Sequence, residues 1–126
     1  MEGAAMSMNY GLEILKRKGI KIKQIRLTGG GAKSPLWRQI CADVFNVECR
    51  ILKSEEAAAL GAALQALWAY ETRKNGEHKI DIWTDKFVKL KSTVSLPEKS
   101  NVKLYKEIYN RQQKLSNQLL PLFAGK

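Results

Sequence analysis

The sequence has few residues that bind metals: two cysteines, Cys41 and Cys49, and a single histidine, His78, among 126 residues. Seven residues separate the two cysteines and no histidine is near them, which is not the spacing of a zinc site. We therefore expect no metal site in this chain. Each cysteine is expected to pack as a small apolar side chain, Cys41 on a helix and Cys49 on a strand.

Long apolar runs are also absent. The longest, Ala57 to Leu64, is far shorter than the roughly 20 residues that a membrane-spanning helix needs. The amino terminus does not show a basic segment followed by a long apolar one, so it does not resemble a signal peptide. We expect no membrane partner and a cytoplasmic location. The length and the average composition predict a single globular domain over residues 1–126.

The net charge of +10, from 22 basic and 12 acidic side chains, raises the possibility of a nucleic-acid-binding module. Its distribution weakens that alternative. Residues 1–70 hold ten basic and six acidic side chains, and residues 71–126 hold twelve and six, so the excess is spread along the chain. A dense basic cluster at residues 16–23 falls where a helix should end, and cations are favourable there. We expect no nucleic-acid partner.

The first 70 residues read as alternating helices and strands. Apolar residues at helical spacing predict a helix over residues 3–18, with Gly19 as its left-handed stop. A short strand around Ile25 and Leu27 then runs into Gly29-Gly30-Gly31. Ser34 followed by Pro35 is typical of a helix start, and that helix should reach about Asn46.

A second strand is predicted over residues 47–51, where apolar and charged residues alternate. Ser54 is expected to cap a third helix that carries many small side chains. Beyond residue 70 the prediction is a polar turn at Asn75-Gly76, a short helix within 80–90, and a final helix over 101–119 that Pro121 ends. We divide the chain into an α/β part at 1–70 and a tail at 71–126.

The order of these elements predicts an α/β fold. The three glycines would lie at the carboxyl end of a strand and open a helix, which is where open α/β sheets bind ligands. A P-loop is excluded, because Leu27 and Ala32 stand where its glycines must be, and the dinucleotide fingerprint fits weakly, because its third small position falls on Ser34. Close backbone approach of an anionic ligand and a glycine-rich turn without a ligand both stay open.

Two segments carry a resemblance to a known family. IRLTGGGAKSPLWRQICADVF, followed by EEAAALGAALQALWAY, resembles the carboxy-terminal signature of the FGGY carbohydrate kinases, and most closely the branch that phosphorylates D-xylulose. EGAAMSMNYGLEILKRKG is similar to the helix before that signature, and VKLYKEIY to the terminal helix. The resemblance covers most of the chain and leaves mainly residues 71–97 without a counterpart.

The resemblance implies the actin-like ATPase fold, in which two ribonuclease H-like domains close over ATP and sugar. This chain would be the end of the second domain and hold part of the ATP site. Gly29, Gly30 and Gly31 would lie along the adenosine and the α-phosphate with Ala32 beside them, and Ser34 would lie near a nucleotide contact. The adenine side would be supported by Gly61 and Ala62.

The reaction implied is transfer of the γ-phosphoryl of ATP, with Mg²⁺, to a pentulose such as D-xylulose; another sugar or polyol is the alternative within the family. The sugar-binding residues, the catalytic aspartate and the earlier phosphate loops would lie in portions not present here. We therefore expect no catalytic residue in this chain, and we interpret Asp43 as a surface or capping group. Unburied apolar surface is expected to make the chain a homo-oligomer.

Overall fold

Three strands form the sheet of the computed structural model, which describes residues 1–123. They are β1 (Gln24–Leu27), β2 (Glu48–Leu52) and β3 (Leu90–Ser95), in the order β1-β2-β3. β1 and β2 run parallel and are connected through α2, while β3 is antiparallel to β2. The sheet and its helices confirm the expected α/β class, and the carboxyl ends of β1 and β2 lie together.

The core lies between α2 (Pro35–Phe45) and the sheet. Cys41 and Phe45 of α2 pack with Cys49 of β2, and Leu12 of α1 (Glu2–Arg17) contacts this cluster. Both cysteines are fully buried and free, as expected from the sequence. Burial raises the pKa of the Cys41 thiol to about 11 and that of the Cys49 thiol to about 12, so both are protonated at neutral pH.

The ends of the first two helices follow the local signals in the sequence. α1 ends at Arg17, and Gly19 has the positive φ of 84° that reverses the chain after it. α2 begins at Pro35 after Ser34, whose side chain accepts a hydrogen bond from the Trp37 amide. Asn46 ends α2 in the left-handed conformation. Gly19 thus lies between α1 and β1, while the two ends of α2 lie between β1 and β2.

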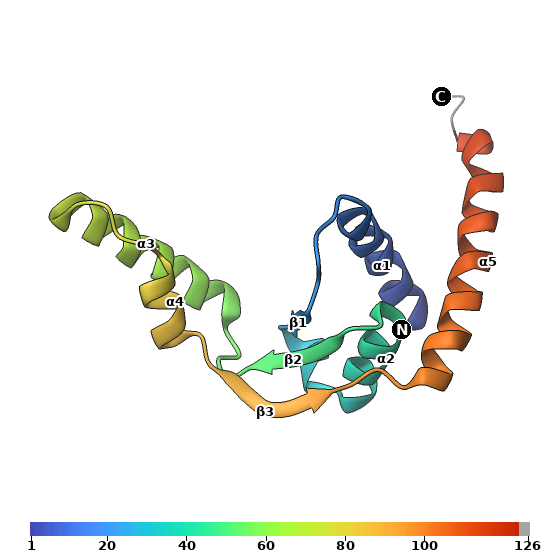
Figure 1. The fold of residues 1–126 in the computed structure, drawn as a ribbon, viewed down its shortest axis with the longest axis horizontal. Helices are drawn as coiled ribbons and strands as arrows, with labels where there is room; N and C mark the ends of the chain where they lie inside the picture. The colour runs from blue at the N-terminus through green and yellow to red at the C-terminus, as the bar shows by residue number, and fades with distance from the viewer. Residues whose placement is uncertain (124–126) are drawn as a thin grey trace.

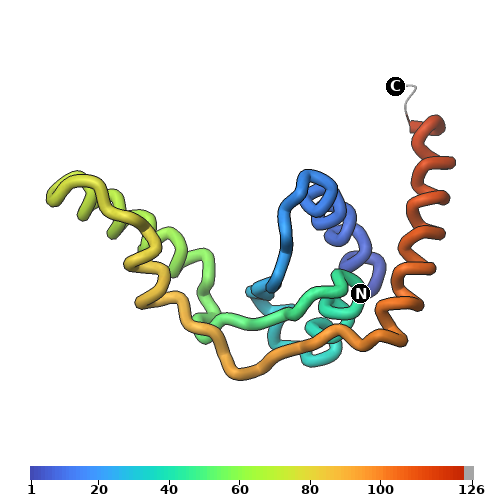
Figure 2. The backbone as a smooth tube through the Cα atoms, in the orientation of Figure 1, coloured from blue at the N-terminus to red at the C-terminus, as the bar shows by residue number. Residues whose placement is uncertain are grey.

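Two helical arms extend from this centre on opposite sides (Figure 1). One arm consists of α3 (Ala57–Asn75) and α4 (Asp81–Phe87). Trp68 Nε1 of α3 donates a 2.6 Å hydrogen bond to the carbonyl of His78, in the segment that connects the two helices. The other arm is α5 (Lys99–Phe123). Figure 2 shows β3 running beneath the centre from the first arm to the second. None of the helices among residues 1–123 is long and apolar enough to cross a membrane.

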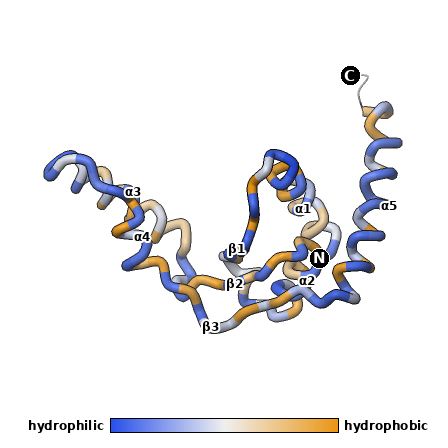
Figure 3. Tube along the Cα trace, viewed as in Figure 1, coloured by the Kyte–Doolittle hydropathy of each residue, from blue (hydrophilic) through white to orange (hydrophobic). Residues whose placement is uncertain are grey.

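The apolar residues are unevenly placed along the trace. Figure 3 shows hydrophobic segments at β2 and in the neighbouring centre, whereas much of α5 is hydrophilic. Several large apolar side chains on α5 are nevertheless exposed, among them Leu115, Leu119 and Phe123. Exposed apolar side chains gathered on a projecting helix are typical of a surface that contacts another part of a protein.

The structure corrects three expectations about the ends of elements. Ser54 does not cap α3, which begins at Ala57 after Glu56 without a side-chain cap; the Lys53 amide donates to the Lys89 carbonyl at 2.8 Å and keeps the chain in the sheet longer. The segment 80–90 contains α4, but β3 begins at Leu90 and was not expected. Pro121 lies inside α5 and does not end it, because the exposed last turn lets water satisfy the carbonyl that loses its amide partner.

Of the two expected roles of Asp43, the capping role is confirmed and the surface position was wrong, because Asp43 is buried. The residue is only 2% exposed. Its carboxylate accepts hydrogen bonds from the Glu98 amide at 2.8 Å and from the Asn101 side chain at 3.0 Å. Gln39, one turn earlier in α2, donates to it at 2.9 Å. Asp43 therefore fastens the start of α5 to α2, where a negative charge also suits the helix dipole.

Candidate functional site

The glycine loop connects β1 to α2. After Thr28, Gly29 has a φ of 79° and a ψ of −174°, a conformation that essentially only glycine adopts. A short 3₁₀ helix follows over Gly30–Lys33. The Ala32 amide donates to the Gly29 carbonyl and the Ser34 amide to the Gly31 carbonyl, both at 3.1 Å. The loop is thus a defined turn rather than an extended linker.

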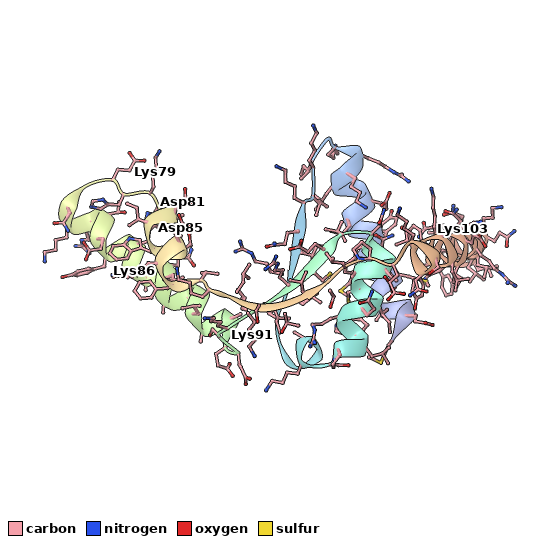
Figure 4. The ribbon with its side chains drawn as sticks, turned by 60° about the horizontal axis from the view of Figure 1, so that its bottom comes forward. Lys79, Asp81, Asp85, Lys86, Lys91 and Lys103 are labelled. Atoms are coloured by element: carbon pink, nitrogen blue, oxygen red, sulfur yellow. The ribbon has the colours of Figure 1, made fainter. Side chains whose placement is uncertain are left out.

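This loop borders a hollow of about 340 Å³ at the carboxyl ends of β1 and β2. The hollow is lined by both apolar and charged residues. Its lining residues are Leu27, Thr28, Gly29, Gly30, Ala32, Lys33, Ile51, Leu52, Ser54, Glu55, Glu56 and Lys91. Figure 4 shows Lys91 on β3, close to where the strand passes the base of the α3–α4 arm. The carboxyl ends of parallel strands are the usual place for a ligand in such sheets.

The glycines differ in what a side chain would meet. A Cβ added to Gly29 or Gly30 would meet nothing within 4 Å, whereas one added to Gly31 would lie 3.2 Å from the Trp37 ring. Gly30 has an ordinary φ, so the unusual backbone angle of the loop belongs to Gly29. The space beside Gly29 and Gly30 is therefore free for a ligand, while Gly31 is needed for packing against Trp37.

Two amides of the loop are available as donors. As the first residues of the 3₁₀ helix, Gly30 and Gly31 have no carbonyl partner within it, and their amides make no other backbone hydrogen bond among residues 1–123. Free amides at the start of a helical turn bind oxygen atoms that carry negative charge. The loop can thus hold a phosphate or hydroxyl oxygen without a charged side chain.

Two of the residues that line the hollow form an ion pair. Lys33 Nζ lies 2.8 Å from Glu55 Oε2, and both side chains are largely exposed. This hydrogen bond raises the pKa of Lys33 and lowers the pKa of Glu55. An exposed pair of this kind contributes little to stability. Lys33 can therefore leave Glu55 and pair with an anionic ligand at a small cost in free energy.

The residues predicted from the sequence are only partly brought together. Gly29, Gly30 and Ala32 line the hollow, whereas Gly31 and Ser34 do not. The Ser34 side chain is already the acceptor for the Trp37 amide at 3.3 Å. The sequence interpretation omitted Lys33, Glu55 and Lys91. Lys33 could have been found, since it lies within the glycine motif, but Lys91 comes from a strand that the sequence did not reveal.

The role of Ser34 as a helix cap leads to a stability prediction. Ser34→Ala should lower the free energy of unfolding by about 1 kcal/mol, because the Trp37 amide loses its acceptor. Urea denaturation of the chain measures the change. Ser54→Ala is the matched control and should change stability by less than about 0.5 kcal/mol, since Ser54 caps no helix. Equal losses in the two variants would contradict this assignment of the caps.

A larger groove, of about 610 Å³, lies elsewhere, between α1, α2 and α5. Its lining is largely polar and includes Asn9, Tyr105, Tyr109 and Lys106. We prefer the smaller hollow as the candidate site, because the groove lies away from the carboxyl ends of the strands and has no glycine loop. Among residues 1–123 no group of three or more His, Cys, Asp or Glu side chains could hold a metal ion.

Comparisons with known proteins show the family to which the chain belongs. Residues 1–70 match the model of the C-terminal domain of the FGGY family of carbohydrate kinases. A xylulose kinase of Haemophilus influenzae is 46% identical over 112 residues, covering 88% of this chain and 22% of that kinase. One from Staphylococcus epidermidis is 33% identical over 124 residues, 98% of this chain and 24% of that kinase. A Bacillus licheniformis ribulokinase is 30% identical over 116 residues, covering 91% of this chain and 21% of that protein.

Solved structures of sugar kinases have the same fold. A gluconate kinase from Lactobacillus acidophilus superposes with a TM-score of 0.78 at 23% identity over 94% of this chain and 23% of its own. A xylulose kinase from Rhodospirillum rubrum gives 0.75 at 23% identity over 98% and 24%. The expected fold class, part of the second ribonuclease H-like domain of an actin-like sugar kinase, is confirmed. The chain spans under a quarter of the length of these proteins.

Proposed function

Because the chain belongs to the FGGY family of carbohydrate kinases, we propose that it is the ATP-binding carboxy-terminal part of an enzyme that phosphorylates a pentulose. The reaction is transfer of the γ-phosphoryl of ATP to D-xylulose, which gives D-xylulose 5-phosphate. The 46% identity to a xylulose kinase supports this substrate. Ribulokinases and a gluconate kinase are also similar, so another sugar or polyol is the alternative acceptor.

The observation that carries the proposal is the open space beside Gly29 and Gly30 at the end of β1. A nucleotide backbone can approach there without meeting a Cβ, and the free amides of Gly30 and Gly31 can donate to its ribose or α-phosphate oxygens. Ala32 lines the same space, and Lys33 can turn from Glu55 to a phosphate. Ser34 supports the loop as the cap of α2.

Catalysis in such a kinase depends on positioning and charge stabilisation, without a covalent intermediate. This chain would hold the adenosine end of ATP at a fixed place relative to the sugar, which the rest of the enzyme would bind. Mg²⁺ would neutralise the phosphates in the complete enzyme. The described residues offer it no cluster of ligands, so we assign no metal-binding role to them. Asp43 cannot act as the base, because it is buried and already holds three donors.

The test is a coupled assay of the complete enzyme with ATP and a panel of D-xylulose, L-xylulose, D-ribulose and gluconate. D-xylulose should give the highest kcat/KM. The present chain alone should phosphorylate none of them, since it contains no base and no γ-phosphate loop. ATP-dependent turnover by the isolated chain would overturn the division of roles, and a higher kcat/KM for another acceptor would overturn the substrate.

We also propose that residues 1–126 act as one unit, in which 1–70 contribute the nucleotide loop and 71–126 the tail. The location is cytoplasmic, and ATP is the partner rather than nucleic acid. The exposed apolar side chains of α5 favour self-association of the isolated chain. Sedimentation velocity should show dimers or larger species at high concentration, and a strictly monomeric profile would contradict this.

A further inference from the structure

Arg38 connects the first turn of α2 to the glycine loop. Its Nη1 atom donates to the Ala32 carbonyl at 2.8 Å and to the Lys33 carbonyl at 3.0 Å. Both acceptors belong to the 3₁₀ turn that borders the hollow. Hydrogen bonds from a charged donor are stronger than those between neutral groups. A single side chain thus fixes the direction of two consecutive peptide groups in the loop.

The position of Arg38 is unfavourable for α2 itself. It lies at the fourth residue of the helix, near the positive end of the dipole, where a cation is disfavoured and where α2 has no acidic residue to balance it. Within residues 1–123 Arg38 forms no salt bridge, and its Nε atom is buried without a hydrogen-bond partner. Stabilisation of α2 therefore does not explain why an arginine stands at position 38, whereas its two hydrogen bonds to the loop do.

Arg38 does not line the hollow. Its effect on a ligand would therefore pass through the loop. If the carbonyls of Ala32 and Lys33 are held toward α2, the turn that begins at Gly30 keeps one conformation, and the Gly30 and Gly31 amides stay free for the ligand. Without this restraint, the loop could satisfy those amides internally or lose its turn.

We propose that Arg38 is a positioning residue for nucleotide binding, which holds the glycine loop in its ligand-ready conformation without touching the nucleotide. The inference rests on the proposed function for its effect on ATP. The restraint on the loop is independent of that function and can be measured without ATP. Lysine cannot replace arginine fully, since its ammonium lacks the planar guanidinium donor that serves both carbonyls.

The experiment compares Arg38→Ala and Arg38→Lys with Arg26→Ala, which removes the same charge from an exposed position on β1. In the complete enzyme, Arg38→Ala should raise the KM for ATP about tenfold, which corresponds to about 1.4 kcal/mol, and leave the KM for the sugar unchanged. The KM for ATP of Arg38→Lys should lie between those of the wild type and Arg38→Ala. Arg26→Ala should behave as wild type. An equal rise of the KM for ATP and the KM for the sugar in the folded Arg38→Lys enzyme would overturn the proposal. An unchanged KM for ATP would overturn it as well.

Hydrogen exchange of the chain separates this proposal from the proposed function. The amides of Ala32 and Ser34, which donate within the loop, should exchange at least about tenfold faster in Arg38→Lys than in wild type, while core amides of α2 keep their protection. If the complete wild-type enzyme shows no kinase activity, the proposed function fails while faster exchange still supports the restraint. Unchanged exchange at both amides would overturn the role of Arg38 whatever the enzyme does.

Discussion

Gly30→Val in the complete enzyme should raise the KM for ATP about 30- to 150-fold, equivalent to about 2–3 kcal/mol of lost binding. The reason is spatial: a Cβ at Gly30 points into open space that the nucleotide would occupy. Backbone strain does not contribute, because Gly30 has an ordinary φ. The KM for the sugar should hardly change. Initial rates with each substrate varied separately measure both constants.

A graded series strengthens this test. Gly30→Ala adds only one methyl group and should give a smaller increase than Gly30→Val. Gly29→Ala instead strains the backbone at a φ of 79° and should destabilise the loop by about 1–3 kcal/mol even without ligand. Circular dichroism establishes that each variant is folded. If folded Gly30→Val binds ATP normally, or if both substrates weaken equally, the loop is a structural turn and the site lies elsewhere.

Asp43→Ala should lower the free energy of unfolding by about 2–4 kcal/mol. The substitution removes the acceptor of three hydrogen bonds, and the Glu98 amide and the Asn101 side chain lose this acceptor at partly buried contacts. The start of α5 would then detach from α2. Urea denaturation measures the loss, and hydrogen exchange at Val102, whose amide donates to the Glu98 carbonyl, reports the start of α5.

Asn101→Ala is the matched control, since it removes one of the three donors and keeps the carboxylate. It should lower stability by about 1 kcal/mol. The KM for ATP of the complete enzyme should be unaffected in both variants if they fold, because neither residue lines the hollow. A similar small loss of unfolding free energy in both variants would show that Asp43 does not hold the start of α5 against α2.

The elements predicted well are those whose signals are local. Gly19 ends α1 because a left-handed residue is needed there, and Ser34 with Pro35 begins α2 because capping is decided within one turn. The expected burial of Cys41 and Cys49 is confirmed for a similar reason, since each stands on the apolar side of an alternating or helical pattern.

The elements missed depend on contacts between distant residues. β3 is an edge strand with mostly exposed side chains, so it lacks the apolar alternation that reveals a strand. Asp43 is buried only because Glu98 and Asn101 reach it from more than 50 residues away. The glycine part of the site could be predicted from its motif, but Lys91 joins it through β3. Arg38 is a different case, because the carbonyls that it binds are only five and six residues away and no recognised motif marks that contact.

The central claim is that this chain contributes the nucleotide side of the site and no sugar side. Its most direct test is a titration of the isotope-labelled chain with MgATP and, separately, with D-xylulose, followed by amide NMR shifts. MgATP should shift the amides of Gly29, Gly30 and Lys33 and leave those of Tyr105 and Tyr109 in the larger groove unchanged. D-xylulose should shift none of them. Shifts confined to the groove with MgATP, or comparable shifts at the loop with D-xylulose, would contradict the account.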